Sequence, residues 1–140
     1  MALKILPSAS FLARQNNSFC RFLNRVLYHC QVGDKTFIPK STYFGHDGVG
    51  VLIGEGVKLG KNVIIYPNVI IGKGDISNPN TGDDYPLIGN NVTICSGSIL
   101  FGKIKIGNNV SIGPGSLVDR DIPDDCSFYR DVIHKKRKLQ

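Results

Sequence analysis

The sequence predicts an all-β fold, a parallel β-helix with a short N-terminal helix, and the main reason is a repeat of six residues. Aliphatic residues recur at this period, and only the stretch 73–87 interrupts the count. The repeated residues are Ile53, Leu59, Ile65, Ile71, Ile88, Ile94, Leu100, Ile106, Ile112 and Val118. A helix would place them three or four apart and an ordinary strand two apart. A period of six indicates a chain that turns a corner every six residues, as a β-helix does.

Glycine supports the same interpretation, because it often follows the repeated aliphatic residue, from Ile53-Gly54 to Ile112-Gly113. Glycine relieves crowding where a chain bends and adopts positive φ angles at no steric cost. Small or β-branched residues stand four places after the aliphatic one: Val57, Val63, Val69, Val92, Ser98, Val110 and Ser116. Three short faces would then close one triangular turn of roughly eighteen residues, with the aliphatic side chains stacked inside.

The chain divides into three parts around this repeat. They are an N-terminal helical segment at 1–31, a β-helix domain at 32–126 with an outward loop at 73–87, and a basic C-terminal tail at 127–140. A helix is predicted at about 17–30, because apolar residues recur there at helical spacing. We expect it to pack across one end of the β-helix; the alternative is a weak peripheral contact with an anionic membrane surface. The tail is expected to be solvated.

Composition limits the function classes. The chain has 140 residues and a formal net charge of +6, which fits one domain and an anionic small-molecule partner. No motif for binding nucleic acid is present, so we expect no nucleic-acid partner. Four cysteines show neither CxxC pairs nor metal-ligand spacing, which indicates reduced thiols in a cytoplasmic protein and no metal. No apolar run approaches the roughly 18 residues of a membrane span.

Three motifs in the repeat region resemble the left-handed β-helix acyltransferases. They are the corner Gly45-His46 followed by Gly50-Val51-Leu52-Ile53-Gly54-Glu55, the loop end Thr81-Gly82-Asp83-Asp84-Tyr85-Pro86-Leu87-Ile88-Gly89, and the closing run from Ile112 to Pro123. Within that family the chain looks most like the serine acetyltransferase branch, which includes O-acetyltransferases of bacterial surface polysaccharides. The resemblance covers roughly residues 32–125. It implies a left-handed coil, a homotrimer, and acetyl-CoA bound in clefts between neighbouring subunits.

His46 is the candidate general base. Acetyl transfer from a thioester to an alcohol requires a neutral hydroxyl to lose its proton as it attacks. A nearby histidine can accept that proton and pass it to the leaving thiolate. His46 is the only histidine inside the repeat region, since His29 and His134 lie in the flanks. The alternative is a structural histidine at a corner.

The sequence departs from the serine acetyltransferases at residues that assist the base. The family aspartate that orients the histidine corresponds to Gln31, and the Arg-His pair that ends the loop corresponds to Asp84 and Tyr85. Tyr85 either hydrogen-bonds the acceptor or anchors the loop, and Asp84 either contacts the acceptor or is simply solvated. Asp47, next to His46, is a candidate for orienting the base and contacting the substrate.

The acetyl-CoA site is predicted on small corner residues. Ser96-Gly97 and Pro114-Gly115 match the positions at which the family lets the pantetheine arm approach the backbone. Coil geometry alone also requires small residues there. The basic tail is a further candidate, for the 3′-phosphate of CoA.

The prediction is therefore an acetyl-CoA-dependent O-acetyltransferase that modifies a sugar hydroxyl in surface-polysaccharide synthesis. The alternative is a serine O-acetyltransferase of cysteine biosynthesis. A sugar is favoured because Asp84 stands where the family has an arginine, and a carboxylate repels the carboxylate of serine. Residues 1–31 are also too few for the larger helical domain of serine acetyltransferases. Two other classes fit less well: a zinc β-helix enzyme needs three imidazoles, and a scaffold would need neither His46 nor the loop.

Overall fold

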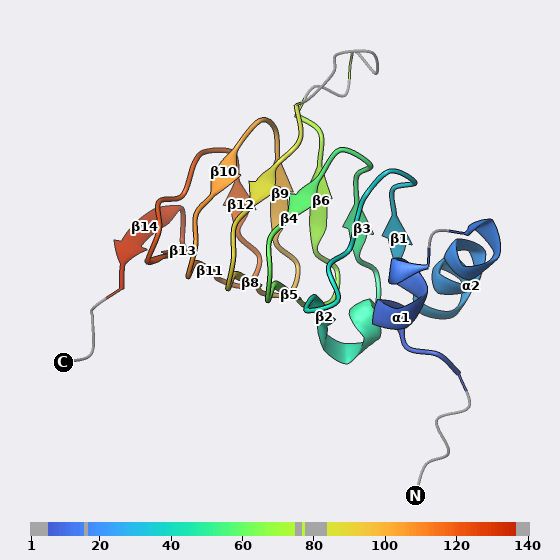
Figure 1. The fold of residues 1–140 in the computed structure, drawn as a ribbon. Helices are drawn as coiled ribbons and strands as arrows, with labels where there is room; N and C mark the ends of the chain where they lie inside the picture. Colours follow the sequence, from blue (N-terminus) through green and yellow to red (C-terminus); the bar gives the residue numbers. More distant parts are fainter. Residues whose placement is uncertain (1–5, 16, 75–76, 78–83, 137–140) are drawn as a thin grey trace, which may run out of the picture.

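The structure is a computed structural model that describes residues 6–15, 17–74, 77 and 84–136, so most of the loop predicted at 73–87 lies outside the described residues. Two short helices precede a coil of short strands (Figure 1). The helices are α1 (Ala9–Arg14) and α2 (Ser18–Tyr28), and a 3₁₀ turn η1 spans Gly45–Gly48. The strands are β1 (Gln31–Val32), β2 (Tyr43–Phe44), β3 (Leu52–Ile53), β4 (Lys58–Leu59), β5 (Ile64–Ile65), β6 (Ile70–Gly72), β7 (Leu87–Ile88), β8 (Thr93–Ile94), β9 (Ile99–Phe101), β10 (Lys105–Ile106), β11 (Ser111–Ile112), β12 (Leu117–Val118), β13 (Cys126–Tyr129) and β14 (Val132–Lys135).

The strands stack into three sheets that form the faces of a prism. Sheet A contains β1, β3, β6, β9 and β12; sheet B contains β2, β5, β8, β11, β13 and β14; sheet C contains β4, β7 and β10. From β3 to β12 the chain visits sheets A, C and B in that order, coil after coil. Each strand pairs in parallel with its equivalent in the next coil, as Ile53 with Ile71 and Ile71 with Leu100. This pairing confirms the predicted parallel β-helix.

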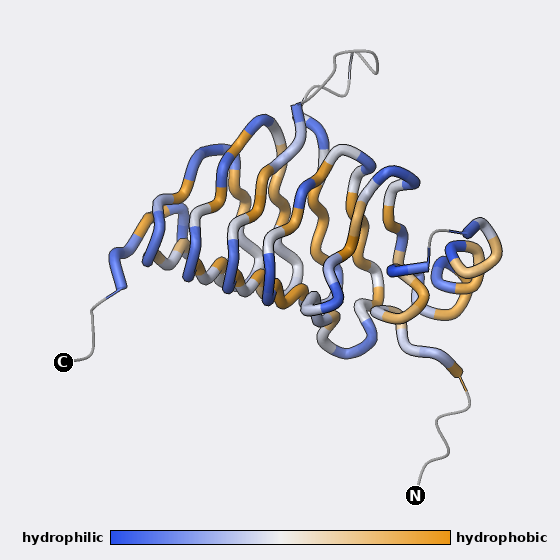
Figure 2. Tube along the Cα trace, viewed as in Figure 1, coloured by the Kyte–Doolittle hydropathy of each residue, from blue (hydrophilic) through white to orange (hydrophobic). Residues whose placement is uncertain are grey.

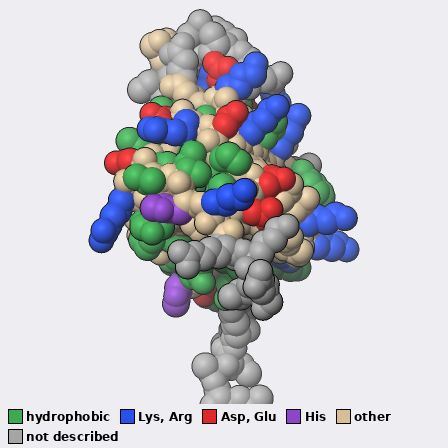
Figure 3. Space-filling model, turned by 90° about the vertical axis from the view of Figure 1, so that its left-hand side faces the viewer, with side chains coloured by type: hydrophobic (Ala, Val, Ile, Leu, Met, Phe, Trp, Pro, Cys, Tyr) green, Lys and Arg blue, Asp and Glu red, His purple; other side chains and the backbone are tan. Residues whose placement is uncertain are grey.

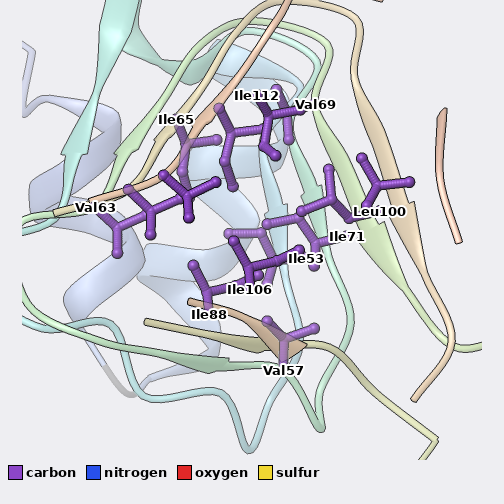
Figure 4. Packing of buried hydrophobic residues seen from close by; sticks show 14 of the residues in the cluster. Ile53, Val57, Val63, Ile65, Val69, Ile71, Ile88, Leu100, Ile106 and Ile112 are labelled. Atoms are coloured by element: carbon purple, nitrogen blue, oxygen red, sulfur yellow. The ribbon is translucent and has the colours of Figure 1, made fainter. Parts of the chain in front are cut away.

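The repeated aliphatic residues form one continuous core inside the prism. All ten predicted positions point into it, with Leu59 half-buried and the others buried. Figure 4 shows Ile53, Ile71 and Leu100, which come from three successive coils, lying next to one another. Figure 2 shows the same division along the chain, with hydrophobic strands and hydrophilic corners. Each buried side chain of this kind contributes roughly 1.5–3 kcal/mol relative to an exposed one, so the hexapeptide repeat is also the source of stability.

Asparagine side chains connect the coils along the edge between sheets C and B. Asn62, Asn91, Asn109 and Asp125 all have φ angles between 55° and 57°. Asn62 Nδ2 donates to Asn91 Oδ1 at 3.0 Å, Asn91 Nδ2 to Asn109 Oδ1 at 3.1 Å, and Asn109 Nδ2 to Asp125 Oδ1 at 2.9 Å. Asn and Asp tolerate this left-handed conformation better than other side chains, because they can hydrogen-bond locally. We call these four residues the asparagine ladder.

The N-terminal part contains two helices instead of the one predicted. The helix expected at 17–30 is α2, and α1 precedes it with Ser8 as its N-cap. α1 packs against η1 and β2 and buries Ala9 and Leu12. Among the described residues, no helix is both long and apolar enough to cross a membrane.

α2 contacts β1 at the N-terminal end of the β-helix, but most of its apolar side chains are exposed. The apolar side chains that α2 exposes are Phe19, Phe22, Val26 and Leu27. The residue that α2 buries is Asn24, and Arg21 forms an ion pair with Asp34 at the start of the coils. These polar contacts turn the polar side of α2 inward and leave its apolar side facing outward.

The C-terminal end is also more regular than predicted. In place of a solvated tail, β13 and β14 form an antiparallel hairpin that extends sheet B. Lys136 Nζ donates to the carbonyl of Asn109 at 2.7 Å and to Ser111 Oγ at 2.9 Å, which fixes the hairpin on the preceding coil. Figure 3 faces this end and shows Lys and Arg side chains around exposed hydrophobic ones. Residues 137–140 of the predicted tail lie outside the described residues.

Candidate active site

The corners of successive coils stack into the edges of the prism, and two of these edges carry the predicted site residues. The B–A edge, where the chain passes from sheet B to sheet A, contains residues 45–51, 66–69, 95–98 and 113–116. The A–C edge contains, of the described residues, 54–57, 73–74, 84–86, 102–104 and 119–121. His46, Asp47, Ser96, Gly97, Pro114 and Gly115 lie on the B–A edge, whereas Asp84 and Tyr85 lie on the A–C edge.

His46 occupies the first corner of the B–A edge, where the chain makes the tight turn η1 instead of a regular bend. His46 and Asp47 both adopt the left-handed conformation, with φ angles of 48° and 58°. The His46 side chain is exposed, and its ring centroid lies 6.3 Å from that of Tyr66. Tyr66 packs so tightly on Gly45 that a Cβ atom there would be 2.7 Å from the tyrosine ring. Non-glycine residues in this backbone conformation are often found at functional sites.

A hollow of about 420 Å³ lies beside His46, between α1 and the corner. This volume falls within the roughly 300–1,000 Å³ of small-molecule sites. The lining residues are Ser8, Ser10, Arg14, Thr42, Tyr43, Phe44, His46 and Asp47. The hollow therefore combines an imidazole, a carboxylate, a guanidinium and several hydroxyl groups in one place.

Several lining residues were missing from the sequence-based prediction because α1 was missing from it. Ser8 accepts a hydrogen bond from the backbone N–H of Phe11 at 3.3 Å, so a serine cap before a short apolar run was a readable start of a helix. Arg14 and Thr42 are 28 residues apart in the sequence. No local pattern could have paired them, because they meet only when α1 folds onto β2.

The small residues predicted to contact acetyl-CoA continue the B–A edge away from His46. The N–H of Gly97 donates to the carbonyl of Pro67 at 3.1 Å, and the N–H of Gly115 donates to that of Ser96 at 2.9 Å. Ser96, Gly97, Pro114 and Gly115 are all exposed. A Cβ atom at Gly115 would meet nothing within 4 Å, so this corner is open to an approaching molecule. The edge thus offers a path with small side chains that begins at the His46 corner.

Tyr85 is packed against the prism. A Cβ atom at Gly54 or at Gly56 would lie 2.7 Å or 2.1 Å from its ring, which also contacts the core. This arrangement favours the loop-anchor interpretation of Tyr85. Asp84 precedes it at the same corner, so within one subunit both residues lie on a different edge from His46.

Gln31, the counterpart of the orienting aspartate in the family, lies at the start of sheet A. Its backbone N–H donates to the carbonyl of Val51 at 2.8 Å, and its side chain is exposed. In the part of the chain that the structure describes, no cluster of three or more His, Cys, Asp or Glu residues could hold a metal ion.

The outer face of sheet A carries a column of aliphatic side chains. Its members are Leu52, Ile70, Ile99 and Leu117, which we call the aliphatic column. They are directly paired in the strand register and each is 37–51% exposed. The equivalent positions on sheet C include Lys58 and Lys105. A contiguous apolar surface of this kind is typical of a contact with another protein.

Known proteins share this architecture. Residues 85–120 match the family of bacterial transferase hexapeptides, six repeats. The chain is 35% identical over 105 residues to the serine acetyltransferase of Synechococcus elongatus, which covers 75% of this chain and 41% of the relative. The structure of soybean serine acetyltransferase complexed with serine is 30% identical, with a TM-score of 0.70 over 85% of this chain and 49% of the soybean chain. This chain carries the hexapeptide repeat of that transferase family and is similar to serine acetyltransferases over most of its length.

The fold of the hexapeptide-repeat family extends over the whole described chain. Serine acetyltransferase from Neisseria gonorrhoeae, at 23% identity, superposes with a TM-score of 0.82 over 99% of this chain and 58% of that chain, which supports the fold alone. The chain spans about half the length of the curated relatives it matches. Those relatives are acetyltransferases, a class whose acyl donor is acetyl-CoA.

The comparisons overturn the prediction of a sugar acceptor in surface-polysaccharide synthesis, because the relatives are serine acetyltransferases. That prediction depended on Asp84, which stands where the family has an arginine. The structure adds a charge that the prediction did not include. Asp84 lies on the A–C edge of the same subunit, and a different arginine, Arg14, lines the hollow at His46.

Proposed function

We propose that this hexapeptide-repeat protein is a serine O-acetyltransferase, which transfers the acetyl group of acetyl-CoA to the hydroxyl of L-serine. The observation that carries the proposal is the hollow of about 420 Å³, where His46 stands with one cationic residue, Arg14, and one anionic residue, Asp47. Serine carries both charges and needs a partner for each, whereas a neutral sugar needs neither. The serine acetyltransferase relatives support the same acceptor.

His46 acts as the general base in this proposal. The imidazole removes the proton of the serine hydroxyl as the oxygen attacks the thioester carbon, because a neutral hydroxyl is a weak nucleophile. The C–S bond then breaks, the acetyl group stays on the serine oxygen, and His46 returns the proton to the thiolate of CoA. Both substrates are held at once and no covalent bond to the protein forms. The exposed imidazole of His46 supports this role, because both substrates can reach it.

Acetyl-CoA is proposed to lie along the B–A edge, with its thioester at His46. The exposed corners at Ser96-Gly97 and Pro114-Gly115 support this path, because their small side chains leave the backbone accessible to the pantetheine arm. The pantetheine amides could then pair with backbone groups of the corners. A flexible chain such as pantetheine binds more tightly to a surface that needs no rearrangement, because less conformational entropy is lost on binding.

A homotrimer is proposed to complete the site. When three prisms turn their sheet A faces toward a threefold axis, the B–A edge of one subunit meets the A–C edge of the next. Asp84 and Tyr85 would then approach the His46 hollow of the neighbouring subunit, although they are separated from His46 within one subunit. The aliphatic column on sheet A supports this arrangement, since the core of an interface between identical subunits is more apolar than ordinary surface.

The test is a steady-state assay of CoA thiol release by the full chain. The acceptors are L-serine and, as neutral hydroxyl compounds, N-acetylglucosamine and glucose. We expect kcat/KM for L-serine of about 10⁴ M⁻¹s⁻¹ or more, with O-acetylserine identified by mass spectrometry. Acetylation of a sugar without any acetylation of serine would contradict the proposal.

A further inference from the structure

We propose that Arg14 and Thr42 form the site for the α-carboxylate of the amino-acid acceptor, so that a residue of α1 takes the place of the arginine that the loop lacks. The inference deepens the proposed serine acetyltransferase function and rests on it. Arg14, Thr42 and His46 line the same hollow. A carboxylate bound at the first two would place the adjacent serine hydroxyl next to the third.

The guanidinium of Arg14 is held in a fixed position. Its Nη2 donates to the carbonyl of Lys40 at 2.7 Å and to the carbonyl of Thr42 at 2.8 Å. These bonds connect the end of α1 to the segment before β2, and they immobilise the side chain before any substrate arrives. A preorganised donor of this kind binds its ligand without first losing conformational freedom.

Two polar atoms at this place are buried and have no hydrogen-bond partner among the described residues. They are Nε of Arg14 and the hydroxyl of Thr42, and the Thr42 residue is only 1% exposed. A buried donor that makes no hydrogen bond destabilises the fold, so such groups are rare and usually have a reason. A ligand oxygen in the hollow would provide both atoms with an acceptor.

The serines of the same wall can add donors. Ser8 Oγ accepts from the N–H of Phe11, and Ser10 Oγ accepts from the N–H of Phe44, both at 3.3 Å. A hydroxyl that accepts a hydrogen bond still has its own proton to donate. The two serines therefore present donors to an anion, in addition to the cationic side chain.

Within the described part of the chain, the charge of Arg14 has no anionic partner. The ion pairs of Arg21 with Asp34 and of Arg120 with Asp119 do not include it. Both recorded partners of Arg14 are neutral carbonyls. A charge-assisted bond to a carboxylate is about twice as strong as a bond between neutral groups, so the guanidinium gains most from an anionic ligand.

The test compares L-serine with L-serinamide, which keeps the hydroxyl and the amine but has no carboxylate. Wild-type protein, Arg14→Met, Arg14→Lys and Thr42→Val are assayed for thiol release and, by calorimetry, for binding of both compounds. Arg21→Met is the matched control, because it removes an arginine of the same N-terminal part that already has its own carboxylate partner. Thermal unfolding shows that each variant is folded.

We expect Arg14→Met to lower kcat/KM for L-serine about 10- to 100-fold, mainly through KM, and to change that for L-serinamide about threefold or less. Arg14→Lys should fall between wild type and Arg14→Met, because it keeps the charge without the planar fork. Thr42→Val should raise KM for serine several-fold and at the same time raise the melting temperature, since it removes an unpaired buried hydroxyl. Arg21→Met should keep the wild-type preference for serine.

The outcomes separate the inference from the proposed function. If wild type acetylates serine and the Arg14 and Thr42 variants keep its preference for serine over serinamide, the carboxylate site is wrong and the function stands. If wild type acetylates neither compound, the proposed function is wrong. The carboxylate site is then supported only if wild type binds serine more tightly than serinamide and Arg14→Met abolishes the difference. An equal affinity would overturn both.

Discussion

Tyr85 lies so close to Gly56 that a Cβ atom added to the glycine would stand 2.1 Å from the tyrosine ring. The contact joins the end of the loop at 73–87 to the preceding coil. It also packs the ring against the core of the prism. The position of Tyr85 therefore depends on the absence of a side chain at Gly56.

Gly56→Ala is expected to destabilise the protein by roughly 1–3 kcal/mol, the usual cost of forcing an extra methyl group into a packed contact. The matched control is Gly72→Ala, where an added Cβ atom would meet nothing within 4 Å. That substitution should stay within about 0.5 kcal/mol of wild type or be slightly stabilising. Urea unfolding of the two variants measures the difference, and equal stabilities would show that the Tyr85 contact is not tight.

His46→Asn should lower kcat for acetyl transfer by about two to four orders of magnitude, the usual contribution of a general base. Asparagine suits this position because it tolerates the positive φ angle of 48° at residue 46. The fold should therefore be unchanged by circular dichroism. His134→Asn is the control, because His134 stacks on Tyr129 in the C-terminal hairpin. Near-normal turnover by His46→Asn would assign the base to another residue.

Asn91 lies inside the asparagine ladder, with a hydrogen bond on each side, and its replacement separates the effect of these bonds from that of backbone strain. Asn91→Ala loses two side-chain hydrogen bonds and strains a residue whose φ is 55°. We expect it to cost about 2–4 kcal/mol in free energy of unfolding. Asn91→Gly loses the same bonds without the strain and should cost about 1 kcal/mol less. If chemical denaturation gives the same value for both variants, backbone strain does not matter at this corner.

Cys30 predicts a pH dependence of stability. Burial of the side chain raises the pKa of the Cys30 thiol from 9.0 to about 11, and the Asn24 side chain opposes this rise through a hydrogen bond. The thiol thus stays protonated in the folded protein while it ionises in the unfolded chain. Its stabilising contribution, on the order of 2–3 kcal/mol, is complete below pH 9 and is lost as the pH rises toward 11. Subtracting the pH profile of Cys30→Ala from that of wild type isolates this contribution; a flat difference between pH 8 and 11 would contradict it.

Ile99→Asp should convert the proposed trimer to monomers, because it places a charge in the middle of the aliphatic column on sheet A. The side chain is 37% exposed in one subunit, so the monomer should still fold. Thr93→Asp makes an equivalent change on the outer side of sheet B and serves as the control. Sedimentation at micromolar concentration distinguishes the species. A trimer of Ile99→Asp, or a monomer of the wild type, would show that the column is not the interface.

The coils could be predicted because every repeated aliphatic residue indicates the same inward-facing position in a repeat of six. Ile53 and Ile71 point inward for the same reason, and an error at one repeat would be corrected by the next. The turn at His46 was recognisable from its glycines and its place before the repeat. Which edge each predicted residue occupies also follows from the count of six, once the order of the sheets is known.

The N-terminal part could not be read in this way, because nothing in it repeats. The apolar spacing in α2 gave the helix but not its orientation, which depends on the burial of Asn24 and on the pairing of Arg21 with Asp34. Hydrogen bonds to the carbonyls of Lys40 and Thr42 hold Arg14 at the site, and no periodic pattern in the sequence encodes them. The same limit applied to Asp84, because the sequence pattern does not show that this residue and His46 lie on different edges of one subunit.

The asparagine ladder shows that successive coils are evenly spaced along the axis of the prism. Asn91 and Asn109 are 18 residues apart, whereas Asn62 and Asn91 are 29 apart, and the same type of hydrogen bond joins each pair. The longer coil closes where the N–H of Gly74 donates to the carbonyl of Asp84. Each coil thus adds about 4.8 Å along the axis. The His46 corner and the corner at Pro114-Gly115 are three coils apart, about 14 Å in all. The number of coils, more than any single side chain, therefore sets how long an extended donor molecule the edge can accommodate.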